Sequence, residues 1–235
     1  MNKQIEKLRL FFLFLFFIFC LTPLTWSFSP IIRVKILEQS KNISIGATGP
    51  YQIENEKGRR QFYSSSTLLR KIEATSSGIK VDSIIWGKEI WIKPQGNNSL
   101  ALIMIEEDKR RYRGDLLIKE EEGFLKVVNQ LPLEEYLYGV IRGEIDSAWE
   151  EAAVMAQAIA ARSYALKKIR DNPEKDYHLL NTESDQIYRG YEAEDLLAKL
   201  AVDKTYGMVV TYNGCLLYTS DAADELDGVD LGGRR

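Results

Sequence analysis

The sequence is poor in the residues that most often build metal centres and covalent cross-links. Its 235 residues contain two cysteines, Cys20 and Cys215, and a single histidine, His178. Two cysteines, one of them within an apolar leader, give no disulfide framework. One histidine offers neither a metal-ligand cluster nor a catalytic triad. We therefore expect no metal or other cofactor, and we expect His178 to be structural or simply exposed.

The sequence also has no excess of charge of either sign. Its 31 lysines and arginines face 34 aspartates and glutamates, which leaves a formal net charge of -3. Nucleic-acid-binding domains usually show a strongly basic face, so we expect no nucleic-acid partner, and a neutral sugar polymer fits better. The hydrophobic fraction of 45% is enough for one domain of ordinary size. No internal repeat stands out.

A long apolar run occurs near the N-terminus. Residues 1–10 are basic and polar, residues 10–21 are uninterrupted apolar side chains rich in phenylalanine, and no charge follows until Arg33. This pattern predicts that residues 1–30 are a signal peptide or, if uncleaved, an N-terminal membrane anchor. In either case we expect the remainder to work outside the cytoplasm, secreted or anchored to the membrane.

Residues 31–128 have the texture of short strands. Segments rich in β-branched and aromatic residues, such as IRVKIL, SIIW, EIWIK, SLALIMIEE, DLLIKE and FLKVVN, are separated by Gly, Asn and Asp. They predict an antiparallel sheet or small barrel. Phe62, Tyr63 and the serines after them are interpreted as a loop. Trp86 and Trp91 could stack on sugar rings, but strand aromatics more often lie in the core, which we favour.

Residues 131–165 show the most ordered pattern in the chain. Leu133, Tyr136, Leu137 and Val140 would form one apolar face of a short helix, and a second helix is predicted over residues 148–169 with Ser147 as its N-cap. Glu144 would lie in the exposed gap between them.

The second of these helices is rich in alanine, and small side chains let another backbone or a ligand come close. Gln157 and Arg162 are long hydrogen-bonding side chains among these alanines. Their simplest interpretation is that both cap carbonyls or face water. Arg162 is equally compatible with a buried structural pairing to Glu151 or Asp146. Tyr164 is interpreted as packing.

Downstream of this helix, the pattern becomes shorter and more polar. Gln186 and Tyr188 fall in a tight turn, residues 194–203 predict an amphipathic helix with Leu196, Leu197, Leu200 and Val202 on its apolar face, and residues 207–214 predict a strand entering a turn. Residues 215–235 have no periodicity and predict a disordered tail. They also resemble a translated sequencing adapter, so we expect a truncation at about Gly214 and no biological meaning for Cys215.

The chain contains the motifs LPLEEY at 131–136, Gly139-Val140 followed by Glu144, Glu151-Ala152, AQAIAARSYA at 156–165 and QIYRG at 186–190. These motifs resemble those of the SpoIID/LytB family of bacterial cell-wall proteins, with weaker similarity in IRVKIL, GPY and YRG upstream. The resemblance covers about residues 31–214. The sequence departs from the family pattern after Glu144, where Ile145-Asp146 replaces the usual methionine and proline. An acidic Asp146 would favour the protonated form of Glu144 if the two carboxyls were close.

The resemblance implies an α+β fold, with a β-rich N-terminal part (31–128) before an incomplete alanine-rich helical catalytic core (129–214) of the SpoIID type. It implies a peptidoglycan lytic transglycosylase that leaves 1,6-anhydro-muramyl ends, with Glu144 as its single acid and base. Such an acid must hold its proton near neutral pH, so we expect a partly apolar pocket around it. Glu134, Glu135, Glu150, Glu151 and Glu183 are accounted for by helix starts or charged faces.

The remaining motif residues receive predicted roles from the same resemblance. Gln157 and Arg162 would orient the Glu144 loop or bind sugar hydroxyls, while Gln186 and Tyr188 would line the opposite wall, the tyrosine ring stacking on a sugar. The alternative is a non-catalytic wall-binding modifier, or enhancer, of an N-acetylmuramoyl-L-alanine amidase. The expected partners are glycan strands, a cell-wall amidase if the protein is a modifier, and the membrane if the leader is retained.

Overall fold

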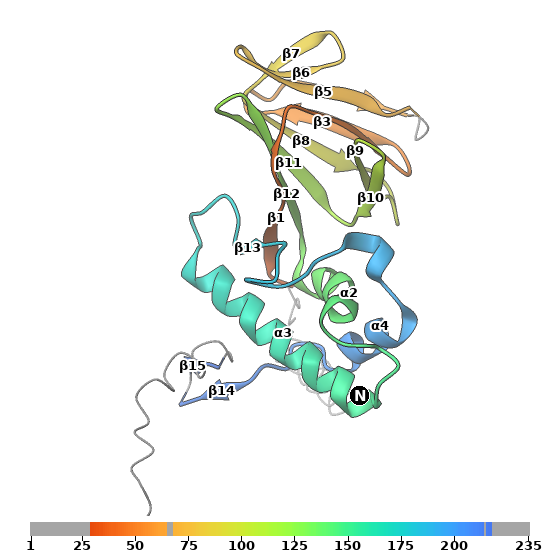
Figure 1. Cartoon of the computed structure of the whole chain (residues 1–235), viewed down its shortest axis with the longest axis vertical. Coiled ribbons are helices and arrows are strands. Elements are labelled where there is room, and N and C mark those ends of the chain that lie inside the picture. Colours follow the sequence, from red (N-terminus) through yellow and green to blue (C-terminus); the bar gives the residue numbers. More distant parts are fainter. Residues whose placement is uncertain (1–28, 65–67, 214, 218–235) are drawn as a thin grey trace, which may run out of the picture.

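The computed structural model describes residues 29–64, 68–213 and 215–217. The predicted leader up to residue 28, the serine-rich segment at 65–67 and the tail from residue 218 lie outside this range. Within it, the chain is α+β as predicted, with most strands in the upper part of Figure 1 and the helices below them, beside the short strands β14 and β15. No helix in the described ranges is long and apolar enough to span a membrane.

Two sheets make up the β-rich part. The larger has seven strands in the order β13-β1-β12-β11-β8-β3-β4, and the smaller has six in the order β10-β9-β2-β5-β6-β7. All neighbours are antiparallel except β1 and β13. The larger sheet comprises β13 (Leu179–Leu180), β1 (Ile31–Ser40), β12 (Phe124–Pro132), β11 (Asp115–Glu121), β8 (Glu89–Pro94), β3 (Tyr51–Asn55) and β4 (Arg60–Tyr63). The smaller comprises β10 (Asp108–Tyr112), β9 (Ala101–Ile105), β2 (Asn42–Ala47), β5 (Arg70–Thr75), β6 (Gly78–Val81) and β7 (Ile84–Gly87).

Alternating side chains explain why these segments are strands with one buried face. In β8, Ile90 and Ile92 are completely buried while Trp91 between them is only half-buried. Trp86 is 3% exposed, which confirms its predicted place in the core. The loop prediction for Phe62 and Tyr63 is wrong, since both lie in β4 and Tyr63 stacks on Tyr51.

The helical part follows directly from β12. Pro132 ends this strand and precedes α2 (Leu133–Glu144), whose buried face includes the predicted Leu133, Tyr136, Leu137 and Val140. The predicted boundary between residues 128 and 129 lies inside β12. The sheet and the helices are therefore joined by a continuous strand rather than by a linker.

The second predicted helix starts later than expected. α3 (Glu151–Asp171) has Glu150 at its N-cap, so the Ser147 cap and the start at residue 148 are wrong. The Asp146 carboxylate accepts a hydrogen bond from the Ala148 amide at 3.0 Å, and the Trp149 amide donates to the Asp146 carbonyl. This turn satisfies the local amides without helix, which is how aspartate competes with helical structure.

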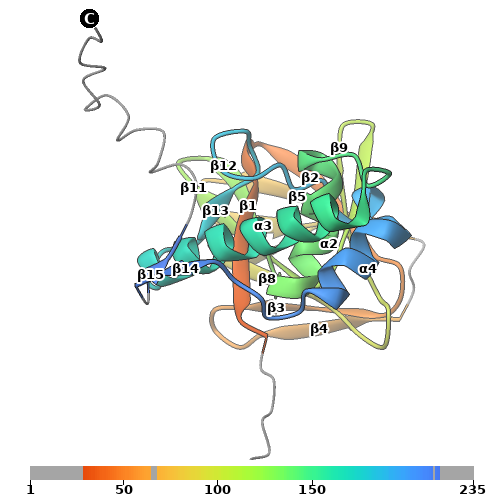
Figure 2. The same ribbon diagram turned by 90° about the horizontal axis from the view of Figure 1, so that it is seen from below.

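The third predicted helix is present but presents a different face. α4 (Leu196–Lys204) is capped by the Asp195 side chain and buries Ala198, Ala201 and Val202. Leu196 and Leu197 are 72% and 54% exposed, so the predicted apolar face is wrong for its leucines, and only Val202 of that face is buried. Small side chains on this face allow close packing against α3 and α2, which lie together in Figure 2.

The last predicted strand is reduced to a short ribbon. Only β14 (Thr211–Tyr212) forms, and it pairs with β15 (Cys215–Leu216), two residues that the sequence assigned to the tail. The Leu217 amide then donates a hydrogen bond to the Val210 carbonyl, which closes the ribbon. The ribbon contacts α3 through β15.

Candidate functional site

The site is built where residues 186–190 cross α2. A Cβ atom on Gly139 would lie 2.7 Å from the Tyr188 ring and 2.9 Å from the Gly190 carbonyl oxygen, and one on Gly143 would lie 2.7 Å from the Ile187 carbonyl oxygen. These two glycines are one helical turn apart and share a face. Their missing side chains let the crossing segment contact the helix backbone.

This crossing fixes the carboxylate of Glu144. The Ile187 amide donates a hydrogen bond to Glu144 Oε1 at 3.0 Å. Among the hydrogen bonds and ion pairs of the described residues, none involves Oε2, so the second oxygen is available to a ligand. Glu144 is the last residue of α2 and not part of a loop between helices.

The surroundings of Glu144 differ from the prediction. Its side chain is exposed, so the carboxyl is not enclosed, although apolar side chains are part of the lining of the adjoining hollow. The helix ends at this residue. Asp146 caps its own turn through Ala148.

Glu144 lies at the edge of a hollow of about 440 Å³ between α3 and the segment before the crossing. Gln157 and Gln186 are on its walls, so the structure brings together three of the five predicted site residues. The full lining is Glu144, Gln157, Ala160, Ala161, Tyr164, Glu183, Ser184, Asp185, Gln186, Val210 and Leu217.

Gln186 also has a structural task. Its side-chain oxygen accepts from the Tyr136 hydroxyl at 3.0 Å, and its amide nitrogen donates to the Ala161 carbonyl at 3.4 Å. The residue is 6% exposed. Gln186 therefore ties the crossing segment to both α2 and α3 next to Glu144.

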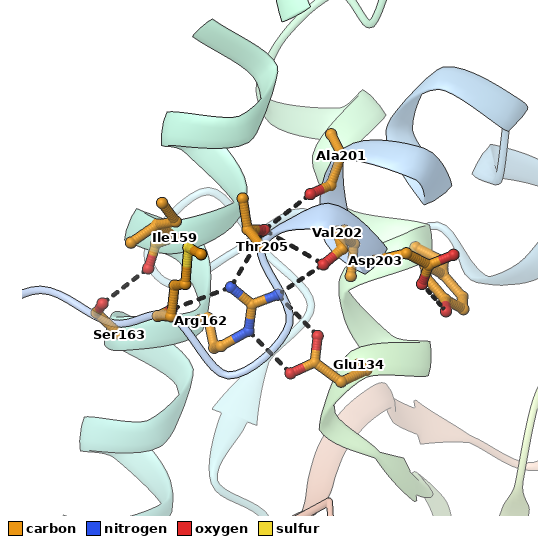
Figure 3. A network of polar contacts seen from close by, with 10 residues as sticks. Glu134, Ile159, Arg162, Ser163, Ala201, Val202, Asp203 and Thr205 are labelled. Atoms are coloured by element: carbon orange, nitrogen blue, oxygen red, sulfur yellow. Dashed lines mark hydrogen bonds and ion pairs between the residues drawn. The ribbon is translucent and has the colours of Figure 1, made fainter. Parts of the chain in front are cut away.

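Arg162 does not reach the hollow. It is 1% exposed, and its guanidinium forms a bidentate pair with Glu134 at 2.8 and 2.7 Å (Figure 3). It also donates to the carbonyls of Val202 and Met208. The buried structural pairing is confirmed, but the expected partners Glu151 and Asp146 are wrong and a direct sugar contact is contradicted, since every donor group is directed into the protein.

Tyr188 is likewise buried, and the predicted stacking on a sugar face is contradicted. It is 1% exposed, its hydroxyl donates to Asn129 Oδ1 at 2.9 Å, and its ring packs against Tyr136 and Tyr112. Burial raises the pKa of Tyr188 well above its ordinary value. The residue anchors the crossing segment to the β-rich part, because Asn129 lies in β12.

Part of this chain is similar in sequence to known proteins. Residues 121–212 match the SpoIID family model, described as Stage II sporulation protein. Residues 121–212 therefore form a SpoIID domain.

Three relatives show how far the SpoIID likeness extends. The chain is 29% identical over 211 residues to an uncharacterised protein of Brachyspira hyodysenteriae, covering 85% of this chain and 55% of that protein. It is 29% identical over 177 residues to the amidase enhancer of Bacillus subtilis, covering 74% and 24%. It is 32% identical over 101 residues to stage II sporulation protein D of Bacillus subtilis, covering 37% and 29%. The chain thus spans about half the length of the first relative and about a quarter of the other two.

Sequence reasoning missed one polar cluster on the wall of the hollow at Glu144. The carboxylate of Asp185 accepts from the Tyr164 hydroxyl at 2.6 Å and the Leu180 amide at 2.8 Å, and it pairs with Lys168 at 2.8 Å. Burial disfavours the Asp185 anion, but the bonds from Lys168, Tyr164 and Leu180 prevail and lower its pKa. Burial, with the bond to Asp185, raises the pKa of Tyr164 to about 12. The spacing of Tyr164 and Lys168, one helical turn, was the available signal.

His178 lies away from the hollow and is structural, as one of the two predicted outcomes allowed. It is 7% exposed, its amide donates to the Arg33 carbonyl, and its ring contacts the Arg33 amide and guanidinium. Burial and the adjacent Arg33 charge lower the pKa of His178 to about 4. In the described residues, no group of three or more His, Cys, Asp or Glu side chains could hold a metal ion.

Proposed function

We propose that this protein is a lytic transglycosylase that cleaves peptidoglycan glycan strands outside the cytoplasm, with Glu144 as acid and base. The observation that carries the proposal is the geometry of Glu144. One carboxylate oxygen is held by the Ile187 amide, and the other is free at the edge of a hollow lined by hydrogen-bonding side chains. A fixed carboxyl with one free oxygen is what single-acid catalysis requires.

The reaction needs one proton donor that is later restored. Protonated Glu144 gives its proton to the glycosidic oxygen as the bond from that oxygen to the anomeric carbon breaks. The C6 hydroxyl of the same sugar then attacks the anomeric carbon and returns its proton to the Glu144 carboxylate. The product is a 1,6-anhydro sugar, and no water is consumed.

Two further carboxylates line the hollow, so a two-carboxylate hydrolase has to be considered. Asp185 is occupied by Tyr164, Lys168 and the Leu180 amide, which keeps it ionised. Glu183 is exposed and makes no ion pair among the described residues. A transglycosylase should tolerate Glu183→Gln, whereas a hydrolase that used Glu183 would lose activity.

The names of two relatives support a role at the cell wall, since they are called stage II sporulation protein D and amidase enhancer. We extend this to glycan strands as the ligand and to residues 129–214 as the part that binds them. A secreted or membrane-anchored location completes the proposal.

The second candidate is a wall-binding modifier of a cell-wall amidase. Two observations favour it: the similarity to an amidase enhancer and the exposure of Glu144, which lacks the enclosed surroundings of a strong acid catalyst. In this case Glu144 and the hollow would bind glycan without cleaving it.

One experiment separates the candidates. The protein is incubated with intact and with amidase-stripped peptidoglycan, and the products are analysed by mass spectrometry. A transglycosylase yields anhydro-muramyl ends with wild type and with Glu183→Gln. A modifier yields no new ends but sediments with the wall and raises the rate of an added N-acetylmuramoyl-L-alanine amidase.

A further inference from the structure

A second hollow lies on the other flank of α2, and none of the proposed roles uses it. It has a volume of about 290 Å³ and is lined by Arg142, Arg189, Glu192 and Ala193. Arg142 and Arg189 come from the two segments that meet at the crossing. The Arg189 amide donates to the Gly139 carbonyl at 3.4 Å, one helical turn before Arg142.

The two guanidinium groups have no counter-charge of their own. Among the described residues, neither side chain makes a hydrogen bond or an ion pair. The one carboxylate in the lining, Glu192, is already engaged, because it accepts from the Arg111 side chain at 2.7 Å and from the Arg111 amide at 3.1 Å. The nearby Asp195 interacts electrostatically with Arg142, but its carboxylate caps α4 by accepting a hydrogen bond from the Ala198 amide.

The position of this arginine pair relative to Glu144 follows from the helix. Gly143 faces the crossing segment, and its neighbours Arg142 and Glu144 project to either side of it. Along the crossing segment, Gln186 lines the hollow at Glu144 and Arg189 lines the second one. A helix with its side chains is about 10 Å across, so an extended polymer bound at Glu144 can reach the arginines.

We propose that Arg142 and Arg189 form a subsite for a carboxylate of the glycan strand beside the bond at Glu144. This inference rests on the proposed binding of peptidoglycan glycan. Arginine is suited to the task because its planar guanidinium donates two parallel hydrogen bonds to a carboxylate. Two unpaired guanidinium groups in one hollow bind an anion far better than a neutral sugar hydroxyl.

Two parts of peptidoglycan supply such a carboxylate. In strands without stem peptides, the lactyl group of each muramyl unit ends in a free carboxylate. In strands with stem peptides, that group is an amide and the carboxylates are in the peptide. A third preparation consists of stripped strands whose lactyl carboxylates have been converted to carboxamides. These strands have neither the lactyl carboxylate nor the peptide carboxylates.

The test measures binding of these three soluble glycan preparations by calorimetry. It uses the full chain carrying Glu144→Gln, so that no strand is cleaved during the measurement, and compares it with the same chain carrying Arg142→Gln and Arg189→Gln as well. Arg170→Gln is the matched control, because Arg170 is an exposed arginine in the last turn of α3 that lines neither hollow. Circular dichroism verifies that each variant is folded.

The proposal predicts that the Glu144→Gln chain binds a carboxylate-bearing preparation roughly tenfold more tightly than the carboxamide strands, as charge-assisted hydrogen bonds imply. Loss of this difference in the double arginine variant, with Arg170→Gln unaffected, supports the subsite. Preference for stripped strands assigns the lactyl carboxylate, and preference for peptide-bearing strands assigns the stem peptide. Equal binding of all three preparations, or an unchanged preference in the double variant, overturns it. If no preparation binds at all, the proposed function fails together with the subsite.

Discussion

The buried pair of Arg162 and Glu134 connects α3 to α2 and, through the carbonyls of Val202 and Met208, to the segment around α4. Removing one partner leaves an uncompensated charge in the interior, which costs several kcal/mol. The pair therefore supports the site indirectly, by holding the helices that frame the hollow.

We predict that Arg162→Met lowers the free energy of unfolding by about 3–5 kcal/mol. The combined change of Arg162 and Glu134 to Met should cost less, because no unpaired charge remains. Urea denaturation measures both. Lys204→Met is the control, since it removes only the exposed pair with Glu151 and should change stability by about 1 kcal/mol or less. Unchanged stability of Arg162→Met with loss of glycan binding would contradict the structural role.

His178 makes the stability depend on pH. Its pKa is lowered to about 4 in the folded protein, whereas an unfolded histidine titrates near 6.5. The unfolded chain therefore takes up the proton first as the pH falls, and stability is lost between about pH 6.5 and 4. Above this window the residue has no effect on the pH dependence.

We predict that this titration lowers the free energy of unfolding by roughly 2–3 kcal/mol between pH 7.5 and 4.5. His178→Gln should remove that part of the pH dependence, while carboxylate titrations remain in both proteins. Urea unfolding at the two pH values gives the comparison. An identical pH dependence in wild type and variant would show that His178 does not titrate in this way.

At the scale of elements, the crossing of residues 186–190 over α2 depends on two glycines. Alanine is normally favoured over glycine in a helix by about 1 kcal/mol. At Gly139 the added methyl group would meet the Tyr188 ring and the Gly190 carbonyl, and at Gly143 the Ile187 carbonyl. Backbone atoms cannot give way cheaply, so the clash should prevail over the helix preference.

We predict that Gly139→Ala and Gly143→Ala each lower the free energy of unfolding by about 1–3 kcal/mol and weaken glycan binding. The loss of binding follows because displacement of Ile187 removes the hydrogen bond that holds Glu144. Gly58→Ala serves as a control: its Cβ would meet nothing within 4 Å, and only backbone strain at its φ of +77° is added. Stabilisation by Gly143→Ala with intact glycan binding would refute the close crossing.

The elements differ in how far the sequence could predict them. The strand at EIWIK, which is β8, and the apolar face of α2 depend on neighbours in the chain, and both predictions are confirmed. The face of α4 is not predictable in this way, because its exposed leucines satisfy the same spacing as a buried stripe. Burial there is decided by packing against α3 and α2, which come earlier in the chain.

The candidate site shows the same division. Residue type and motif led to Glu144, Gln157 and Gln186, which do share one hollow. They could not show that Arg162 and Tyr188 are buried away from this hollow. The partners that hold these two side chains, Glu134 and Asn129, lie 28 and 59 residues away in the chain. The second hollow was missed because Arg142 and Arg189 become neighbours only when the crossing forms.

At the scale of the whole molecule, the β-rich part and the helices share one hydrophobic core. The core contains Ile90 and Ile92 of β8 together with Ala161 and Ala165 of α3. Tyr188 adds a polar link through Asn129 of β12. If either the β-rich part or the helical part unfolds, the core residues of the other part become exposed to water.

We predict one cooperative unfolding transition for both parts. Hydrogen exchange with mass spectrometry, repeated at increasing urea concentration, should give the same opening free energy for core amides of β8 and of α3. A second, lower value for the α3 amides would instead show that the helical part unfolds separately.

The proposed role of Glu144 as acid and base can be tested by mass spectrometry of amidase-stripped peptidoglycan after incubation with wild type, Glu144→Gln and Glu183→Gln. We predict 1,6-anhydro-muramyl ends from wild type and Glu183→Gln, and at least about a hundredfold fewer from Glu144→Gln, as expected for loss of a general acid. Anhydro ends formed equally by Glu144→Gln, or by none of the three proteins, would contradict it.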